Sequence, residues 1–409
     1  MKKSLLLLLT GVSFLFTACK SELDLDTELK FSKLSVEEQK QKVEDNGIEF
    51  VTAMEGMQDT KAMIAVDEFL SVANGSGSYA PLKKLKQDLV NRNAQAFTNF
   101  DKQLRVSVVE SEMWGEWEWN SSTNDMDLIK ELSNKLIIHF PASSSSKTNN
   151  GLITIVYEES TTEVPETGEM YPSKITFVME IDNKEVMSAE YNGTYYSDGS
   201  PKKVTQRFDL EDYSWTAEIA NNQKKASETY EFKKGSKTLL KSEAVVEGTL
   251  KADEIQTAGE NGTPENIVNS FAVYFQMMDI AVKGGTTDFK GMAKELKAIN
   301  TDLSEVDYKK AIAEIVNKYM VAYAFFVDDN RKFADIEFYV YEEDYSYQTY
   351  EYNYETNEYE LVTVSGTNSY LQPRMIMSDG SKVDVEEYVE SGFEDLLDQI
   401  EDLTNDYDY

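Results

Sequence analysis

The feature that most constrains the fold is a two-residue period in hydrophobicity between residues 174 and 250. Apolar and polar residues alternate over three runs, which are Ile175–Ile181, Val204–Leu210 and Tyr213–Ile219. Such alternation places apolar side chains on one face of a β-strand and polar side chains on the other. Turn-forming pairs and triplets separate the runs, for example Asp182-Asn183 and Asn221-Asn222. The pattern predicts an antiparallel meander over about 106–250, with one buried face and one wet face.

Before the meander, apolar residues recur at the spacing of an α-helix. Ser35-Val36-Glu37-Glu38 has the form of a capping box, which opens a helix. Apolar residues then recur at helical spacing from Ile48 to Val72. Asn74–Gly77 should end this helix, and Pro81 suits the first turn of another helix that reaches about Leu104.

Helical signals return after residue 262. Thr263 and Pro264 predict the start of a helix, which Gly284-Gly285 should end. Further elements are expected in the order helix 287–299, helix from Ser304, strands from Val321 to Met377, a hairpin turn at Ser378–Gly380 and a helix from Asp384. Within the strands, the chain should turn at 328–330 and 356–357.

The order helices, strands, helices, strands predicts an α+β protein with a large antiparallel β-meander and packed helices. The chain of 409 residues is long enough for two α+β units, which we expect over 35–256 and 264–409. The polar, glycine-containing segment Thr257–Thr263 should form the joint between them.

The N-terminus has the features of a secretory signal. Lys2 and Lys3 precede an uncharged run from Leu5 to Phe16, which is too short for a permanent membrane span. Phe16-Thr17-Ala18-Cys19 resembles the lipobox of bacterial lipoproteins. The resemblance implies that residues 1–18 are removed as a signal peptide and that the thiol of Cys19 carries acyl chains such as palmitate. The alternative is an ordinary cleaved signal that happens to precede a cysteine.

The residues after Cys19 refine the expected location. Lys20 stands where an aspartate retains many lipoproteins in an inner membrane, so the resemblance implies an outer-membrane lipid anchor. Ser21–Asp26 looks like the acidic tag that exports some lipoproteins to the cell surface. We therefore expect a tether over 19–34 and favour the cell surface, with the periplasmic face as the alternative.

The charge of the chain excludes one class of partner. Asp and Glu number 74 against 40 Lys and Arg, which gives a net charge of −34. Nucleic-acid binding requires clustered cations that displace counterions, so we expect no nucleic-acid partner. Cys19 is also the only cysteine, so no internal disulfide can form.

The sequence lacks the motifs of the common catalytic and metal sites. His139 is the only histidine, and with no partner motif it is expected to be a structural residue in or at the edge of the core. A zinc site of the usual kind needs several nitrogen or sulfur ligands. No glycine-rich phosphate loop or calcium-loop spacing occurs either. The sequence therefore predicts no catalytic residue, metal or cofactor, and a protein that is not an enzyme.

Aromatic residues are the remaining enrichment. In "MWGEWEWN", an extended chain would place Trp117 and Trp119 on one face and Trp114 on the other. Tyr345 and Tyr347 would form one single-face ladder, and Tyr350, Tyr352 and Tyr354 a second. Exposed ladders of this kind can bind a ligand by stacking, whereas the alternative is cross-strand packing.

These features favour a membrane-anchored, non-catalytic binding or scaffold module at the cell envelope, with a glycan or a protein as partner. Two alternatives stay open. The first is a periplasm-facing carrier of a lipid or acyl chain, which would need a continuous apolar cavity. The second is a glycoside hydrolase with a pair of catalytic acids, which would need two convergent carboxylates in one cleft.

Overall fold

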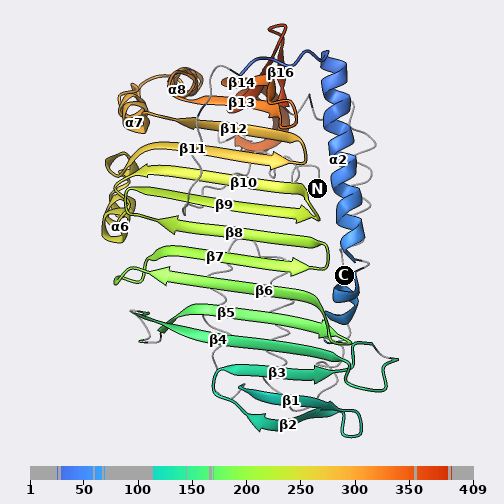
Figure 1. Ribbon diagram of the computed structural model, residues 1–409. Coiled ribbons are helices and arrows are strands. Elements are labelled where there is room, and N and C mark those ends of the chain that lie inside the picture. The colour runs from blue at the N-terminus through green and yellow to red at the C-terminus, as the bar shows by residue number, and fades with distance from the viewer. Residues whose placement is uncertain are drawn as a thin grey trace.

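The computed structural model describes residues 25, 29–58, 60–66, 69, 114–143, 145–164, 168, 170–353, 357–385 and 388. Among these residues, sixteen strands form a single sheet, in which spatial order follows chain order except at one end, where β1 lies between β2 and β3 (Figure 1). The strand pairs are antiparallel apart from β1 and β3, which are parallel. The fold is α+β in class and mostly β.

The elements have the following bounds. The strands are β1 Gly115–Asn120, β2 Asp125–Glu131, β3 Lys135–Phe140, β4 Gly151–Glu163, β5 Met170–Ile181, β6 Lys184–Tyr195, β7 Pro201–Leu210, β8 Tyr213–Asn221, β9 Lys225–Lys234, β10 Lys237–Gly248, β11 Val268–Met277, β12 Ile280–Thr286, β13 Val321–Phe326, β14 Arg331–Asn353, β15 Glu358–Met377 and β16 Lys382–Asp384. The helices are α2 Val36–Gln58, α6 Ala252–Asn261, α7 Phe289–Lys297 and α8 Glu305–Tyr319, with a short 3₁₀ helix at Pro264–Asn266. Residues 61–66 are also helical.

The predicted meander is confirmed as β3 to β10, and its alternation produces the two expected faces. On the apolar face, cross-strand pairs join Met179 to Met187 and Leu210 to Tyr213. Leu210 and Tyr213 are each 1% exposed because helices cover this face. On the opposite face, polar and charged side chains carry ion pairs such as Lys203–Glu218, whose Nζ–Oε2 distance is 3.1 Å. The sheet is therefore a single layer with one packed side.

Helix α2 covers one end of the strands on the apolar face and runs across them (Figure 1). The predicted capping box opens it, because the Glu38 N–H donates to Ser35 Oγ at 3.2 Å and the Ser35 N–H donates to Glu38 Oε2 at 2.7 Å. The Tyr213 hydroxyl donates to the carbonyl of Ala53 at 2.7 Å. This bond and the surrounding apolar contacts fix the helix on the meander.

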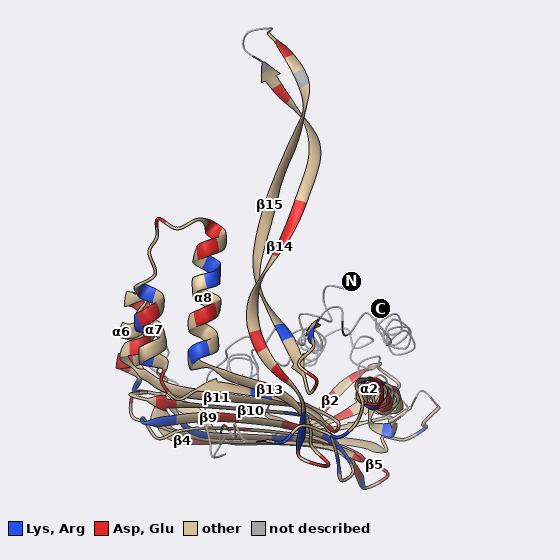
Figure 2. Ribbon diagram, turned by 90° about the horizontal axis from the view of Figure 1, so that it is seen from above, with Lys and Arg blue, Asp and Glu red and all other residues tan. Residues whose placement is uncertain are grey.

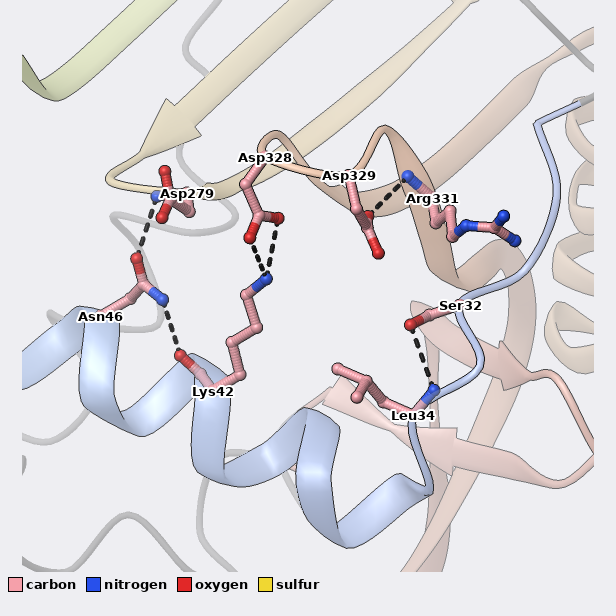
Figure 3. A network of polar contacts seen from close by, with 8 residues as sticks. All are labelled: Ser32, Leu34, Lys42, Asn46, Asp279, Asp328, Asp329 and Arg331. Carbon is pink, nitrogen blue, oxygen red and sulfur yellow. Dashed lines mark hydrogen bonds and ion pairs between the residues drawn. The ribbon is translucent and has the colours of Figure 1, made fainter.

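The N-terminal half of α2 and the segment before it contact two turns, the turn between β11 and β12 and the turn that precedes β14 (Figure 3). Lys42 Nζ lies 2.7 Å from both carboxylate oxygens of Asp328, and Asn46 Oδ1 accepts from the Asp279 N–H at 3.0 Å. Phe31 forms a parallel bridge with Lys332, and the Ser32 N–H donates to the Lys332 carbonyl at 2.7 Å. The last residues of the predicted tether, from Leu29 onward, thus contact the folded sheet.

The helix predicted from Thr263 to Gly285 is wrong. Only Pro264–Asn266 is helical, and the chain continues as the hairpin β11–β12, turning at Met278 and Asp279. Residues 268–277 are rich in β-branched and aromatic types, and they pair along β10 from Leu240 to Gly248. The sheet is therefore continuous across the expected joint, and the strands of both predicted units belong to it. Thr257–Thr263 forms the end of α6 and the turn after it.

The later elements follow the predictions. Asp288 and Ser304 cap α7 and α8 by accepting from the N–H groups of Gly291 and Asp307. Turns occur at 327–330 and 378–380, as expected. Cys19, the stretch from Asn74 to Leu104 and all but a few residues of the C-terminal helix lie outside the described residues. None of the described helices is long and apolar enough to span a membrane.

Candidate functional site

Strands β14 and β15 continue far beyond the sheet that holds their bases. The last residue of β14 that pairs with β13 is Asp335, and the last residue of β15 that pairs with β16 is Arg374. Beyond these positions the two strands pair only with each other among the described residues. Figure 2 shows them rising from the sheet as a twisted two-stranded arm, on the side that also carries α2, α6, α7 and α8. We call Tyr341–Asn353 and Glu358–Tyr370 the ribbon.

The register of the ribbon determines which side chains share a face. Pairing is unbroken from Ala334 to Asn353, so neither strand contains a bulge there. Tyr345 pairs with Gly366 and Tyr347 with Val364, which places both tyrosines on one face, as the alternation predicts. The opposite face carries the pairs Tyr350–Leu361 and Tyr352–Tyr359. Tyr354 lies outside the described residues.

The rings on both faces are open to solvent. Tyr350 is 68% exposed, Tyr359 is 70% exposed and Tyr347 is 55% exposed. Leu361, which pairs with Tyr350, is 53% exposed. A two-stranded ribbon that stands away from the sheet has no second layer to cover it, so its aromatic side chains lie on its surface.

Local contacts order some of these rings without burying them. The Tyr345 ring lies over Gly366, where an added Cβ would be 2.7 Å from its Cζ. Tyr345 also stacks on Tyr347, with centroids 6.0 Å apart and planes at 19°. Near the tip, the Tyr352 and Tyr359 rings meet edge to face at 5.1 Å. The exposed surface is therefore pre-organised, which lowers the entropy cost of binding.

Helix α8 supports the base of the ribbon. The Asn317 side chain donates to the Phe338 carbonyl and accepts from the Phe338 N–H, both at 2.7 Å. Lys310 Nζ is 3.0 Å from Glu342 Oε1, and Lys309 Nζ donates to the Ser369 carbonyl at 2.5 Å. The direction in which the ribbon leaves the sheet is thus set by polar contacts from one helix face.

The ribbon is anionic as well as aromatic. The sequence has no Lys or Arg between Lys332 and Arg374. Acidic side chains are spaced along the arm, at Glu342, Glu343, Asp344, Glu351 and Glu358, and appear as red bands in Figure 2. Negative charge close to exposed tyrosine rings favours cationic groups, which can pair with a carboxylate and stack on a ring.

The three tryptophans of the segment "MWGEWEWN" do not lie on the ribbon. They lie in or next to β1, at the other end of the strand order. Trp114 is 9% exposed and belongs to the main apolar cluster, and Trp117 and Trp119 are partly buried against the same cluster. Trp114 precedes the first residue of β1, so strand alternation does not determine its side. All three side chains contribute to packing.

The other sequence candidates occupy ordinary surface positions. His139 is partly exposed and not in the core, and its Nε2 lies 3.1 Å from Glu116 Oε1. A shallow hollow of about 520 Å³ lies on the polar face and is lined by Glu190, Asn192, Thr205, Gln206, Arg207, Thr216, Ala217, Glu218, Thr229 and Glu243. The carboxylates in it are paired with cations, as in Lys241–Glu243 at 2.6 Å. Among the described residues, no group of three or more His, Cys, Asp or Glu side chains is placed to hold a metal ion.

One acidic residue lies on the apolar face. Glu228 of β9 is partly buried between Ile219 and Ala244 of the flanking strands. Burial raises the pKa of this carboxyl group from its ordinary 4.5 to about 7. It is a structural feature distant from the ribbon in strand order.

Comparison with known proteins adds no family to this description. No family model matches the chain, and no curated protein is significantly similar to it.

Proposed function

We propose that the protein is a lipid-anchored, non-catalytic binding module of the bacterial cell envelope and that the ribbon is its binding element. The observation that supports this proposal is the exposure of large aromatic side chains on both faces of a projecting arm. The arm extends roughly 40 Å beyond the sheet, from about 3.3 Å per strand residue.

The physical argument rests on what a two-stranded ribbon lacks. An isolated pair of strands is marginally stable in water because it has no third strand or packed layer. Soluble proteins also rarely expose large contiguous apolar surface unless a partner covers it. Tyrosine is enriched at binding hot spots, where its ring contributes contact area at a low entropy cost. A partner that covers the ribbon would provide the missing layer.

The two alternative functions find less support. An acyl carrier needs an apolar cavity, whereas the described hollow on the sheet is lined mainly by polar side chains. A glycoside hydrolase needs a free pair of carboxyl groups, whereas Glu218 and Glu243 in that hollow are engaged by Lys203 and Lys241. We assign the two predicted α+β units different roles: 35–256 as a platform, and 264–409 as the part that carries the ribbon.

We also propose that Cys19 is the lipid attachment site and that the protein is displayed on the outer membrane, with the cell surface favoured. Nine residues separate Cys19 from Leu29, which packs against the sheet, so the Cα atoms of Cys19 and Leu29 can lie at most about 36 Å apart. Phe31 lies beside Lys332, at the start of β14. The anchor would therefore attach on the side of the sheet where β14 begins.

Replacing Tyr347, Tyr350 and Tyr359 together by Ala should abolish partner binding without destabilising the fold. Because the rings are mostly exposed, we expect the melting temperature to change by less than about 2 °C. The measurement is the binding of envelope proteins and of immobilised glycans by the purified triple variant. The Tyr308→Ala variant is measured in the same way for comparison. Tyr308 is an exposed tyrosine on α8 and serves as the matched control. Full retention by the triple variant would argue against the ribbon as the binding element.

The Cys19→Ala variant should lose its acyl chains and leave the membrane fraction or remain as an uncleaved precursor. Each buried methylene contributes about 0.8 kcal/mol, so losing the acyl chains removes the main membrane affinity. Fractionation after a salt wash, with mass spectrometry of the N-terminal peptide, measures both effects. A variant that still partitions wholly with membranes would show that the lipobox assignment is wrong.

A further inference from the structure

The outer edge of β14 presents unused backbone N–H and C=O groups, and the strand register shows which residues direct these groups outward. In an antiparallel ladder, alternate residues direct their N–H and C=O groups to opposite sides of the strand. Phe338 directs both groups away from β15, because they bond to the Asn317 side chain. The register shows no shift from Ala334 to Asn353. Asp344, Ser346, Gln348 and Tyr350 therefore direct their backbone groups outward in the same way.

Among the described residues, nothing pairs with this part of the edge. The backbone contacts of β13 end at Asp335, and those of α8 end at Phe338. A free edge of this length can accept an additional strand, and proteins usually protect such edges with Lys, Pro or a bulge. Residues 341–353 contain neither Lys nor Pro, and the ladder contains no bulge there.

Helix α8 already makes two kinds of contact with β14 that an added cationic strand would make, namely hydrogen bonds to the backbone and a cation–carboxylate pair. The Asn317 amide bonds to both backbone groups of Phe338, as a neighbouring strand would. Two helical turns from Asn317, Lys310 pairs with Glu342. The edge thus accepts a strand-like donor and acceptor together with a cation, and the same combination of open backbone and acidic side chains continues toward the tip.

The charge of the edge selects the occupant. Glu343, Asp344 and Glu351 would lie directly beside the side chains of an added strand. The same edge of a second copy would bring like charges together, which is destabilising. Lys or Arg side chains would instead meet carboxylates, and they could also stack on Tyr345 and Tyr347.

We propose that the β14 edge of the ribbon binds an extended, Lys- or Arg-rich segment of another protein as an additional strand. This proposal rests on the proposed function of the ribbon and specifies its partner. Backbone hydrogen bonds would give affinity, and the acids and tyrosines would give preference for alternating cationic and apolar side chains.

The probe for this proposal is a synthetic peptide of alternating lysine and valine, about ten residues long. Binding to the full chain would be measured by fluorescence anisotropy at several salt concentrations. A peptide of alternating glutamate and valine tests charge, and the Lys–Val peptide with N-methyl groups at alternate residues tests backbone pairing. We expect no binding of the first control peptide and about tenfold weaker binding of the second.

The protein variants are matched at one position. Gln348→Pro removes an outward N–H and places a ring on the edge, while its bonds to β15 are spared because the N–H points away from that strand. Gln348→Ala retains the N–H. We expect the Pro variant to bind the Lys–Val peptide about tenfold more weakly, and the Ala variant to bind within about twofold of the parent protein. Circular dichroism verifies the fold of each variant.

A third variant tests the charge of the edge and does not require the ribbon to fold with a proline at residue 348. Glu343→Gln, Asp344→Asn and Glu351→Gln together should weaken binding about tenfold and reduce its salt dependence. Equal affinity of the Pro and Ala variants, or of the N-methylated and parent peptides, would overturn strand addition. Ribbon-dependent retention on glycans without any peptide binding would also overturn it, and would leave the ribbon as the binding element. If the variant with Tyr347, Tyr350 and Tyr359 replaced by Ala kept both glycan retention and peptide binding, both proposals would be contradicted.

Discussion

Replacing Gly285 by Ala should destabilise the protein by about 3 kcal/mol or more, the upper end of overpacking effects. A Cβ at this position of β12 would lie 2.2 Å from the Phe271 carbonyl oxygen and 2.7 Å from the Ala272 Cα. Both atoms belong to the backbone of β11, so no side-chain rotation can relieve the contact. β11 and β12 would have to move apart, and the ladder that joins the meander to β13–β15 would weaken. Urea denaturation followed by circular dichroism measures the loss.

The neighbouring glycine provides the control for this substitution. A Cβ at Gly284 would lie 3.3 Å from the Ala322 Cβ and from the Val321 carbonyl oxygen. This is tight but can be relieved by small shifts, and Ala has a lower entropy cost than Gly in a strand. Gly284→Ala should therefore change the free energy of unfolding by less than about 1 kcal/mol. Equal losses in the two variants would contradict the close approach at Gly285.

The same glycine pair shows why the sequence predicted one region wrongly. Thr263-Pro264 and Gly284-Gly285 are local signals that commonly begin and end helices, and local signals cannot report a neighbouring strand. β11 is instead determined by its pairing with β10, and Gly285 is required by the close approach of two backbones. The meander was predictable because the alternation of apolar and polar residues within each strand shows directly which side chains are buried.

The ribbon was predictable only in part. Alternation placed Tyr345 and Tyr347 on one face and Tyr350 and Tyr352 on the other, and the register agrees. Exposure of both faces could not be derived, because it depends on whether another layer packs on the strands. Acidic residues between the tyrosines, such as Glu351, are a sequence signal for solvent on one side of the strands. The lack of Lys and Arg between Lys332 and Arg374 was a further signal in the sequence.

The tryptophans illustrate the opposite case. "MWGEWEWN" has a composition as suggestive of binding as that of the tyrosine segments. Yet β1 is paired on both sides and its core-facing neighbours Leu136 and Ile138 are almost completely buried. A tryptophan next to such residues contributes apolar contact area to the core. Aromatic enrichment alone therefore does not separate a binding surface from a packed one.

The stability of the protein should fall as pH rises from about 5 to about 8, and Glu228 should be a main cause. Its pKa is raised to about 7 in the folded state because the carboxyl group is buried on the apolar face. In the unfolded chain the group titrates near 4.5, so between these values the folded state binds more protons. The stabilisation is complete below the unfolded pKa and is lost as pH rises through the folded pKa. The shift corresponds to at most about 3 kcal/mol, which partial access of water reduces to about 1–2 kcal/mol.

Glu228→Gln should remove this part of the pH dependence. Glutamine is neutral at every pH and similar in shape, so the variant should match the parent protein near pH 5 and be about 1–2 kcal/mol more stable near pH 8. Glu314→Gln, on the exposed surface of α8, is the control and should leave the difference between the two pH values unchanged. Urea unfolding of the parent protein and both variants at the two pH values measures the six free energies. If Glu228→Gln were no more stable than the parent at pH 8, the carboxylate would have to be solvated or paired in the folded state. The apolar face would then admit water between β8 and β10, which would contradict the burial of the Glu228 carboxyl group.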